Sequence, residues 1–422
     1  MATETETPPF SSLGLSPQSL KAVERAGYQH PTPIQVGAIP LTLAGKDVIG
    51  CAATGTGKTA AFVLPILQRL GLEGGVRALV LSPTRELAVQ IAKQVGMFGA
   101  TRDLRIATLI GGIQMGPQIE ALEAGAQFVI ATPGRLVDHL DQGSIVLDQL
   151  EVLVLDEADR MLDMGFQPQL TRILKHVPAQ RQTLLFSATM AEEVARFAKK
   201  HLKDAVRVEV TPSGTTAERA DQRLYEVSQG EKTGLLLALL ADDTSSTLVF
   251  TRTKRKVDKL AMTLAKQGHK VERLHADRSQ GQRRHALEGF REGRYRVLVA
   301  TDVAARGIDV AEIGHVVNYD LPHDPEDYVH RVGRTARAQA SGRASTFAAP
   351  DDAELLAAIE KVIRGPIPRA PIPRDSKVFQ AYQSSAEAKQ RDPGPPQPGH
   401  GISTRPPGQE PGRHARSHLK KK

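Results

Sequence analysis

The chain has 422 residues, 40% of them hydrophobic, which is too long for one core and suited to two or three domains. Its single cysteine, Cys51, excludes an internal disulfide and is typical of a reducing compartment. No apolar run is long enough to cross a bilayer, and residues 1–6 are acidic rather than signal-like, so we expect a cytoplasmic protein with no membrane partner.

The first half of the chain predicts an α/β domain over residues 10–208. Residues 1–9 read as disordered, residues 10–27 have helical spacing, and Pro31 and Pro33 fix a turn before the next helix. Short apolar runs then alternate with helical patterns, which indicates βαβ units and a parallel sheet. The predicted strands are residues 47–51, 78–82, 105–109, 127–131, 151–155 and 183–187.

A second α/β domain is predicted over residues 223–366, after a linker at residues 209–222 that has few large apolar side chains. Its predicted strands are residues 223–227, 246–250, 270–274, 296–300, 315–319 and 343–348. The predicted fold is therefore α/β, with two tandem domains, each a parallel sheet flanked by helices. Sheets of this kind bind ligands beyond the carboxyl ends of their strands, where the polar motifs of this chain fall.

The positive charge of the chain is concentrated at its end. Residues 367–422 hold eleven Lys and Arg and four Asp and Glu residues, which accounts for +7 of the formal net charge of +8. The segment is rich in Pro, Gly and Gln, which cannot build a packed core, so we expect a disordered basic tail. Its charge indicates a polyanionic partner, although charge alone is equally compatible with a solvated tail that only aids solubility.

Residues 51–59 read C-A-A-T-G-T-G-K-T and lie between a predicted strand and a predicted helix at residues 60–70. This is the context of a phosphate-binding loop, in which Gly55 and Gly57 let the backbone approach an anion and the helix N-terminus points at it. Lys58 is then placed to reach the β- and γ-phosphates, and the Thr59 hydroxyl to ligate Mg²⁺. The alternative is a surface turn with a solvated lysine.

Two carboxylates follow the buried strand that ends at residue 155. Asp156 is the natural partner of Mg²⁺, which prefers carboxylate oxygens and keeps several waters. Glu157 is placed to orient or deprotonate an attacking water. The alternative is an acidic helix N-terminus, which the helix dipole favours on its own.

With these motifs in place, the sequence resembles the DEAD-box RNA helicases of superfamily two. Residues 156–159 spell D-E-A-D, and further family motifs follow in order from residue 10 to about 337. They are P-T-R-E-L-A at 83–88, G-G at 111–112, T-P-G-R at 132–135, S-A-T at 187–189, D-x-x-Q-x-x-R at 277–283, T-D-V-A-A-R-G-I-D at 301–309 and H-R-V-G-R-T-A-R at 330–337. Ala52 is the usual opening residue of the loop in this family, whereas Ala336 replaces a more usual glycine.

The resemblance implies two RecA-like domains that close on ATP, with Mg²⁺, and on RNA. Gln35 has an amide that matches the N6 and N7 edge of adenine, and Phe10 and Tyr28 are placed around the base, although ordinary core packing is the simpler role for isolated aromatics. The remaining nucleotide contacts implied are Thr54, Gly55, Thr56, Gly57, Lys58, Thr59 and, for the ribose, Asp309.

Communication between the domains is implied by two further groups of residues. Arg331 and Arg334 are three apart, on one face if helical, and are expected to point across the cleft at the γ-phosphate, so that hydrolysis requires closure. Asp159, Ser187, Thr189 and His330 resemble the contacts that report the nucleotide state, with capping and turn formation as the alternative roles.

The RNA contacts implied by the resemblance lie in both domains and favour backbone recognition. Hydroxyls, backbone N–H groups and a few arginines suit contacts to phosphate and 2′-OH groups, so little sequence specificity is expected. The residues are Arg85, Gly112, Thr132, Arg135, Thr251, Gln280, Arg283 and Thr301.

We therefore expect a monomeric, RNA-stimulated ATPase that separates short RNA duplexes locally. The compact body indicates the RhlE-type subgroup, with ribosomal precursors or the RNA-degradation machinery as partners. Two alternatives stay open: a DNA helicase or translocase with the same engine, and an ATP-dependent RNA clamp that hardly unwinds. Gln35 and the D-E-A-D form favour RNA, and intact Glu157, Arg331 and Arg334 argue against a dead ATPase but not against a slow clamp.

Overall fold

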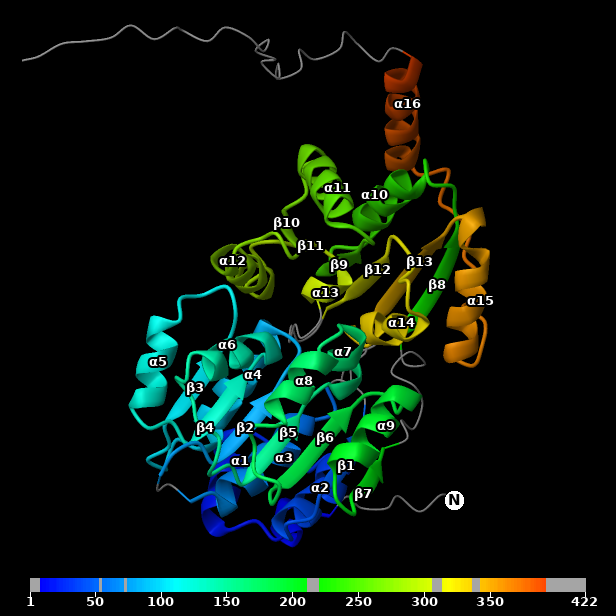
Figure 1. Cartoon of the computed structure of the whole chain (residues 1–422). Helices are drawn as coiled ribbons and strands as arrows, with labels where there is room; N and C mark the ends of the chain where they lie inside the picture. Colours follow the sequence, from blue (N-terminus) through cyan, green and yellow to red (C-terminus); the bar gives the residue numbers. More distant parts are fainter. Residues whose placement is uncertain are drawn as a thin grey trace, which may run out of the picture.

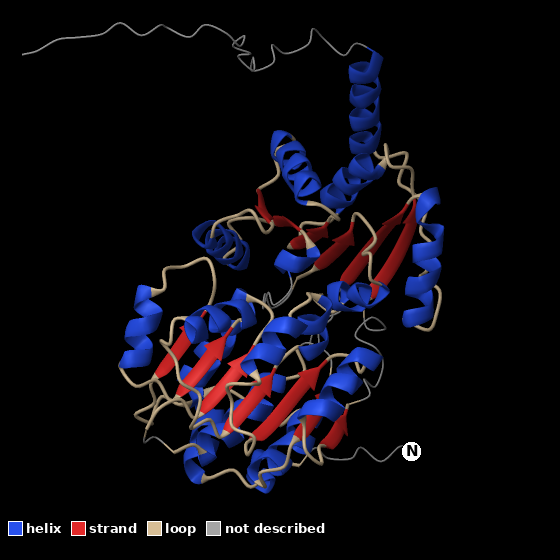
Figure 2. Ribbon diagram, viewed as in Figure 1, coloured by secondary structure: helices blue, strands red, loops and turns tan. Residues whose placement is uncertain are grey.

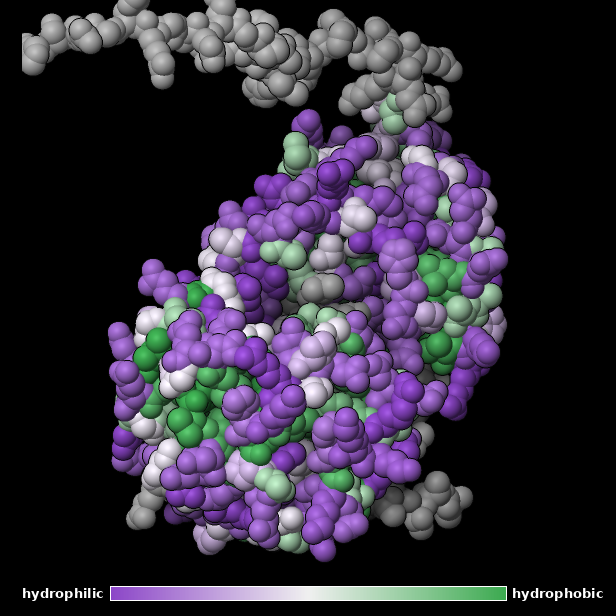
Figure 3. All heavy atoms as spheres, viewed as in Figure 1, coloured by the Kyte–Doolittle hydropathy of each residue, from purple (hydrophilic) through white to green (hydrophobic). Residues whose placement is uncertain are grey.

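The computed structural model describes residues 8–52, 55–71, 74–210, 220–305, 313–335 and 342–391. These residues form two α/β domains stacked end to end, with the C-terminal helix projecting from the second domain (Figure 1). A hollow separates the domains on the face seen in Figure 3, where the surface of the second domain is predominantly hydrophilic. None of the helices in these ranges has both the length and the apolar character that crossing a membrane requires.

Domain 1 is built on a parallel sheet with the strand order β3-β4-β2-β5-β6-β1-β7. Adjacent residues of one strand point to opposite faces, so that Phe128 and Ile130 enter one core and Val129 and Ala131 the other. The strands are β1 Val48–Cys51, β2 Ala78–Leu81, β3 Ile106–Leu109, β4 Phe128–Ala131, β5 Val152–Leu155, β6 Gln182–Ser187 and β7 Val206–Glu209.

Helices cover both faces of this sheet (Figure 2), which is why its inner strands read as continuous apolar runs. In chain order they are η1 Phe10–Leu13, α1 Pro17–Arg25, α2 Pro33–Leu43, α3 Lys58–Arg69, α4 Arg85–Phe98, α5 Gly116–Glu123, α6 Pro133–Asp141, α7 Ala158–Asp163, α8 Gln167–Ile173 and α9 Glu192–His201.

Domain 2 repeats the architecture with a parallel sheet of order β10-β11-β9-β12-β13-β8. Its strands are β8 Asp221–Glu226, β9 Thr247–Phe250, β10 Val271–Leu274, β11 Val297–Ala300, β12 His315–Asn318 and β13 Arg343–Ala348. Its helices are α10 Lys232–Asp242, α11 Lys254–Lys266, α12 Gln280–Arg291, α13 Asp302–Ala305, α14 Pro325–Val332, η2 Pro350–Asp352, α15 Ala353–Val362 and α16 Lys377–Arg391.

The structure confirms the two-domain α/β fold and places every predicted strand within two residues of its expected position. The strand β7 was not predicted, because its side chains are mostly exposed at the sheet edge and its residues 206–209 alternate charged and apolar side chains instead of forming an apolar run. Residues 211–219 of the predicted linker, residues 1–7 and residues 392–422 lie outside the described residues.

The prediction of a disordered tail that begins at residue 367 is wrong for residues 367–391. Ile367 and Phe379 are buried, and the backbone around Arg369 pairs with the outer edge of β8 through Leu224. Arg374 forms an ion pair with Glu231 at the start of α10. We call residues 367–383 the C-terminal strap. Its few apolar anchors lie among prolines and polar residues, so no periodic pattern predicted it.

Candidate functional site

The phosphate loop lies where predicted, between the end of β1 and the start of α3. Gly55 and Gly57 have φ values of 86° and 87°, the left-handed region that glycine adopts without strain. A Cβ atom on Gly57 would lie 2.4 Å from Gln35 Nε2, so this position has no room for a side chain. Lys58 is buried and its Nζ donates to the Ala52 carbonyl oxygen at 2.8 Å. Thr54 lies outside the described residues.

Asp156 and Glu157 are buried at the end of β5, with opposite electrostatic environments. Burial raises the pKa of Asp156 to about 7, with repulsion from Glu157 adding to the effect and attraction by Lys58 opposing it. Burial also acts on Glu157, but the charges of Arg160, Lys58 and Arg334 outweigh it and lower its pKa to about 2. Lys58 therefore lies close enough to act on both carboxylates, and the phosphate loop and the acidic pair form one site.

Arg160 is a site residue that the sequence analysis missed. Its guanidinium forms an ion pair with the Glu157 carboxylate, three positions earlier on the same turn. The two side chains are 9% and 8% exposed, so the pair is largely shielded from water. A basic residue at this spacing from an acid is the signal that would have indicated the pair.

Gln35 lies against the phosphate loop rather than apart from it. Its Nε2 donates to the Gly57 carbonyl oxygen at 3.1 Å, and its Oε1 accepts from the Thr32 N–H at 2.9 Å. A primary amide has a second N–H and a second lone pair, and within the described residues neither forms a further hydrogen bond, although the side chain is only 1% exposed. Of the two aromatics predicted around a base, Phe10 is buried in the core and Tyr28 stacks on Phe98, with ring centroids 5.9 Å apart. Both positions fit the alternative role in core packing.

The structure brings together three of the four predicted coupling residues. The Asp159 carboxylate accepts from the N–H groups of Ala188 and Thr189, both at 2.9 Å, and the Asp159 N–H donates to Ser187 Oγ at 3.3 Å. Burial and the charge of Asp324 raise the pKa of Glu326 on α14 of domain 2, and Thr189 and Asp159 lie close enough to act on it as well. The coupling residues of domain 1 therefore face α14 of the neighbouring domain. His330 lies in domain 2 beside Asp327, with 3.7 Å between Nδ1 and Oδ1.

The prediction that Arg331 points across the cleft is wrong. The residue is 2% exposed, and its guanidinium donates to both Asp302 carboxylate oxygens, to Asn318 Oδ1 and to the Asp320 carbonyl oxygen. It also lies 4.8 Å from the centroid of the Phe250 ring. Helix α14 ends at Val332, so the three-residue spacing does not place Arg331 and Arg334 on one helical face. Arg334 instead acts on Glu157 in domain 1.

The predicted RNA residues of domain 1 converge at the carboxyl ends of β2, β3 and β4. Gly112 has a φ of 77°, and a Cβ atom there would lie 1.9 Å from Arg85 Nη1, so the Arg85 guanidinium passes directly over this glycine. Arg135 donates to the Ile113 carbonyl oxygen from both Nη atoms, at 3.1 and 3.2 Å. Thr132 is buried at the N-terminus of α6.

The predicted RNA residues of domain 2 lie opposite those of domain 1, at the ends of β9 and β11 and on α12. Thr251 is buried and its hydroxyl donates to the Thr253 carbonyl oxygen, Thr301 follows β11, and Gln280 begins α12. Arg283 of α12 pairs with Glu86 of domain 1 at 2.8 Å, with side-chain exposures of only 11% and 9%. This interdomain pair joins the two halves of the predicted RNA surface and was not predicted.

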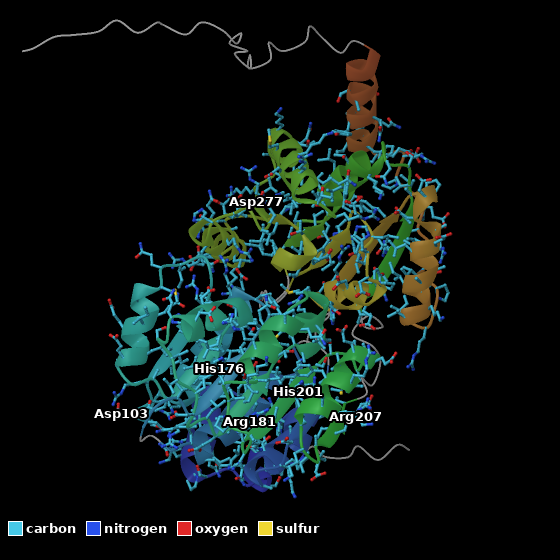
Figure 4. All side chains as sticks on the ribbon, viewed as in Figure 1. Asp103, His176, Arg181, His201, Arg207 and Asp277 are labelled. Carbon is cyan, nitrogen blue, oxygen red and sulfur yellow. The ribbon has the colours of Figure 1, made fainter. Side chains whose placement is uncertain are left out.

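Asp277, labelled in Figure 4, lies just before α12 and forms an exposed ion pair at 2.7 Å with Lys254, the first residue of α11. Asp309, predicted to bind the ribose, lies outside the described residues.

Comparison with known proteins agrees with this arrangement. Residues 32–197 match the DEAD/DEAH box helicase family, and residues 231–339 match the helicase conserved C-terminal domain. The DEAD-box ATP-dependent RNA helicase CshA of Geobacillus kaustophilus is 43% identical over 382 residues, which cover 90% of this chain and 82% of that protein.

Solved structures extend the similarity to three dimensions. Dbp5 of Saccharomyces cerevisiae, bound to RNA and ADP BeF3, superposes with a TM-score of 0.79 at 33% identity, over 90% of this chain and 99% of that one. A DEAD box protein from Methanococcus jannaschii has a TM-score of 0.52 at 37% identity, over 86% and 99% of the two chains. With its motifs, its two parallel-sheet domains and these relatives, the chain belongs to the DEAD-box family of ATP-dependent RNA helicases, which are RNA-stimulated ATPases.

Proposed function

We propose that this helicase separates short RNA duplexes locally, by closing its two domains on ATP and RNA, rather than by travelling along a strand. The observation that carries the proposal is that the interdomain contacts touch both ligand sites at once. Arg334 of domain 2 acts on Glu157, and Arg283 of domain 2 pairs with Glu86 beside the predicted RNA residue Arg85. Closure would then complete the hydrolytic site and the RNA surface in the same step.

In the nucleotide site, Lys58 and the N–H groups at the start of α3 would hold the ATP phosphates. The buried Asp156, with its raised pKa, is a carboxylate that gains from a nearby cation, and Thr59 lies in the first turn of α3. Asp156 and Thr59 would therefore hold Mg²⁺, which neutralises phosphate charge when bound.

Glu157 would orient the attacking water, because its low pKa keeps it ionised and able to accept a hydrogen bond from that water near neutral pH, although the same low pKa makes it a weak base. Arg334 would stabilise the charge that develops on the transferred phosphoryl group. Arg331 would act indirectly, by holding Asp302 and β12 in place within domain 2. Gln35, already bound to the phosphate loop, would use its remaining donor and acceptor to select adenine over guanine.

The relative placement of the two domains supports the closed arrangement as the working state. The chain superposes more closely on Dbp5 with RNA and ADP BeF3 than on the Methanococcus jannaschii protein, although the latter is the more similar in sequence. A role in ribosome assembly or RNA turnover, the RhlE-type subgroup and a cytoplasmic location stay predictions from the sequence.

The decisive experiment uses Glu157→Gln, which keeps the shape of the side chain and the ligand Asp156. With the variant in excess over a short RNA duplex, we expect ATP-dependent separation of about one duplex per bound protein and no multiple turnover. Lys58→Ala, which removes the phosphate cation, should neither hydrolyse ATP nor separate strands. A DNA duplex of the same sequence, and an RNA duplex several times longer, should both be separated poorly.

Three results would contradict the proposal. Normal ATP turnover by Glu157→Gln would remove Glu157 from the hydrolytic step. Failure of this variant to separate any RNA strand despite binding ATP and RNA would favour a translocase that needs hydrolysis for each step, or a clamp. Equal activity on long and short duplexes would favour translocation alone.

A further inference from the structure

A buried glutamine holds the glycine-containing loop of domain 1 from within. Gln118, in the first turn of α5, is 4% exposed. Its Oε1 accepts from the Ile110 N–H at 3.1 Å, and its Nε2 donates to the carbonyl oxygens of Ile110 at 3.3 Å and Gln114 at 2.9 Å. One side chain therefore binds both ends of the loop formed by residues 110–114, which contains Gly111 and Gly112.

The amide of Gln118 is itself oriented by a buried histidine on the neighbouring helix α6. His139 has no solvent exposure, and its Nε2 lies 3.4 Å from Gln118 Oε1. Because an amide oxygen only accepts, this contact requires the proton on Nε2, and Nδ1 then accepts from the Ser144 hydroxyl at 2.7 Å, whose single proton is also within reach of the His139 carbonyl oxygen at 3.2 Å. Burial lowers the pKa of His139, which is consistent with this neutral form.

The loop that results presents backbone donors on the predicted RNA surface. Gly112 and Ile113 are exposed, and none of the hydrogen bonds within the described residues uses the N–H groups of Gly111, Gly112 or Ile113. Free backbone N–H groups beside arginines are suited to phosphate oxygens. Because Arg85 passes over Gly112 and Arg135 donates to Ile113, a shift of this loop would displace both guanidinium groups as well.

We propose that Gln118, oriented by His139, is a positioning residue for RNA binding: it fixes the 110–114 loop so that its N–H groups, Arg85 and Arg135 match the spacing of successive phosphates. Neither side chain touches RNA. The inference rests on the proposed RNA contact of this loop, and it assigns a function to two buried side chains that otherwise read as parts of the core.

A matched control comes from the same domain. Gln127 is 3% exposed, and its Oε1 accepts from the Arg105 N–H at 2.9 Å. It immediately precedes β4, so it lies at the amino ends of the strands, away from the 110–114 loop at their carboxyl ends. Gln118→Leu and Gln127→Leu both remove a buried amide that binds the backbone, so both should lower the melting temperature. Only Gln118→Leu should alter RNA binding.

The measurement is the RNA concentration that gives half-maximal ATPase activity. We expect Gln118→Leu to raise it about fivefold or more, with the maximal rate at saturating RNA within about twofold, because the variant lacks several buried hydrogen bonds that hold the loop. His139→Leu should also raise the RNA concentration for half-maximal activity. His139→Gln, whose amide can still donate to Gln118, should restore most of the affinity.

A separate variant distinguishes failure of the inference from failure of the RNA assignment. Arg135→Ala removes a direct contact predicted for RNA. If Arg135→Ala weakens RNA binding but Gln118→Leu and His139→Leu do not, the positioning role is wrong and the RNA surface stands. If Arg135→Ala has no effect, the RNA assignment of the loop is wrong. If Gln127→Leu weakens RNA binding as much as Gln118→Leu does, Gln118 only stabilises the fold and has no positioning role.

Discussion

At the scale of single residues, burial of charge decides which groups can act in chemistry. Arg331 uses four of the five N–H groups of its guanidinium on Asp302, Asn318 and the Asp320 carbonyl oxygen, so its main role is to stabilise domain 2. Arg334, only three positions later, acts on Glu157 of the other domain. The two arginines thus belong to different parts of the mechanism, one to the framework and one to the reaction.

His315 gives a prediction about pH at this scale. It is fully buried on β12, hydrogen-bonded to Ser345, and faces Asp243, Arg343, Arg223 and Asp221. Burial lowers its pKa to about 4, with the two arginines adding to the effect and the two aspartates opposing it. Because the folded pKa lies below the unfolded value of about 6.5, its contribution to stability is complete above pH 6.5 and is lost as the pH falls towards 4.

We therefore expect the unfolding free energy to fall by up to about 3 kcal/mol from this one group between pH 6.5 and 4. The check compares melting temperatures of the wild type and of His315→Gln, which cannot be protonated, at pH 7 and pH 5. The variant should lose less stability on acidification. Equal losses in the two proteins would show that other groups dominate the acid response.

At the scale of elements, the C-terminal strap and helix α16 belong to domain 2 and not to the tail. The strap joins three elements, because it pairs with β8, Arg369 forms an ion pair with Glu360 of α15, and Phe379 packs against α10 close to Gly234. The basic segment outside the described residues, 392–422, retains six Lys and Arg and two Asp and Glu residues. A truncation meant to test the tail must therefore preserve residues up to 391.

Two truncations separate the roles of strap and tail. Deletion of residues 392–422 should raise the RNA concentration for half-maximal ATPase activity and flatten its salt dependence, by about 0.7 in the log–log slope for each phosphate that the tail neutralises. Stability and maximal rate should change little. Deletion of residues 367–422 should in addition expose the sites of Ile367 and Phe379, each worth about 1.5–3 kcal/mol, and lower the melting temperature by about 5 °C or more.

Two results would contradict these expectations. If the shorter deletion leaves half-saturation and salt slope unchanged, the tail is a solvated extension with no part in RNA binding. If the longer deletion is as stable as the shorter one, the strap is not an integral part of domain 2.

At the scale of the whole molecule, ATP and RNA binding should be coupled through the contacts between the domains. Glu86→Gln leaves Arg283 without its charged partner in a largely shielded position. We expect the gain in RNA affinity on adding ADP BeF3 to shrink about tenfold, because removing one partner of such a pair costs at least about 1.4 kcal/mol and coupling between ligands is reciprocal. Glu151→Gln is the control, since the Arg77–Glu151 pair has the same 2.8 Å distance but lies within domain 1.

The sequence predicted most of this structure because its strands are buried on both faces and its motifs follow their ends. It failed where position depends on something other than local pattern. Arg331 was misplaced because its guanidinium is buried on Asp302, Asn318 and the Asp320 carbonyl oxygen, which lie far from it in sequence. The Glu86–Arg283 pair joins segments almost two hundred positions apart, and its existence depends on the placement of one domain against the other. Gln118 and His139 carry no motif of their own, and only hydrogen-bond geometry reveals their link to the loop.

The strap has one more consequence, which concerns solubility. Strand β8 is one of the two outer strands of the second sheet, and an open outer strand is a template for pairing with another chain. The strap covers it near Leu224, and Pro371 and Pro373 have no N–H with which to continue the ladder outwards. The segment therefore shields the outer strand from intermolecular sheet growth, and a chain shortened before residue 367 would be prone to aggregate through β8.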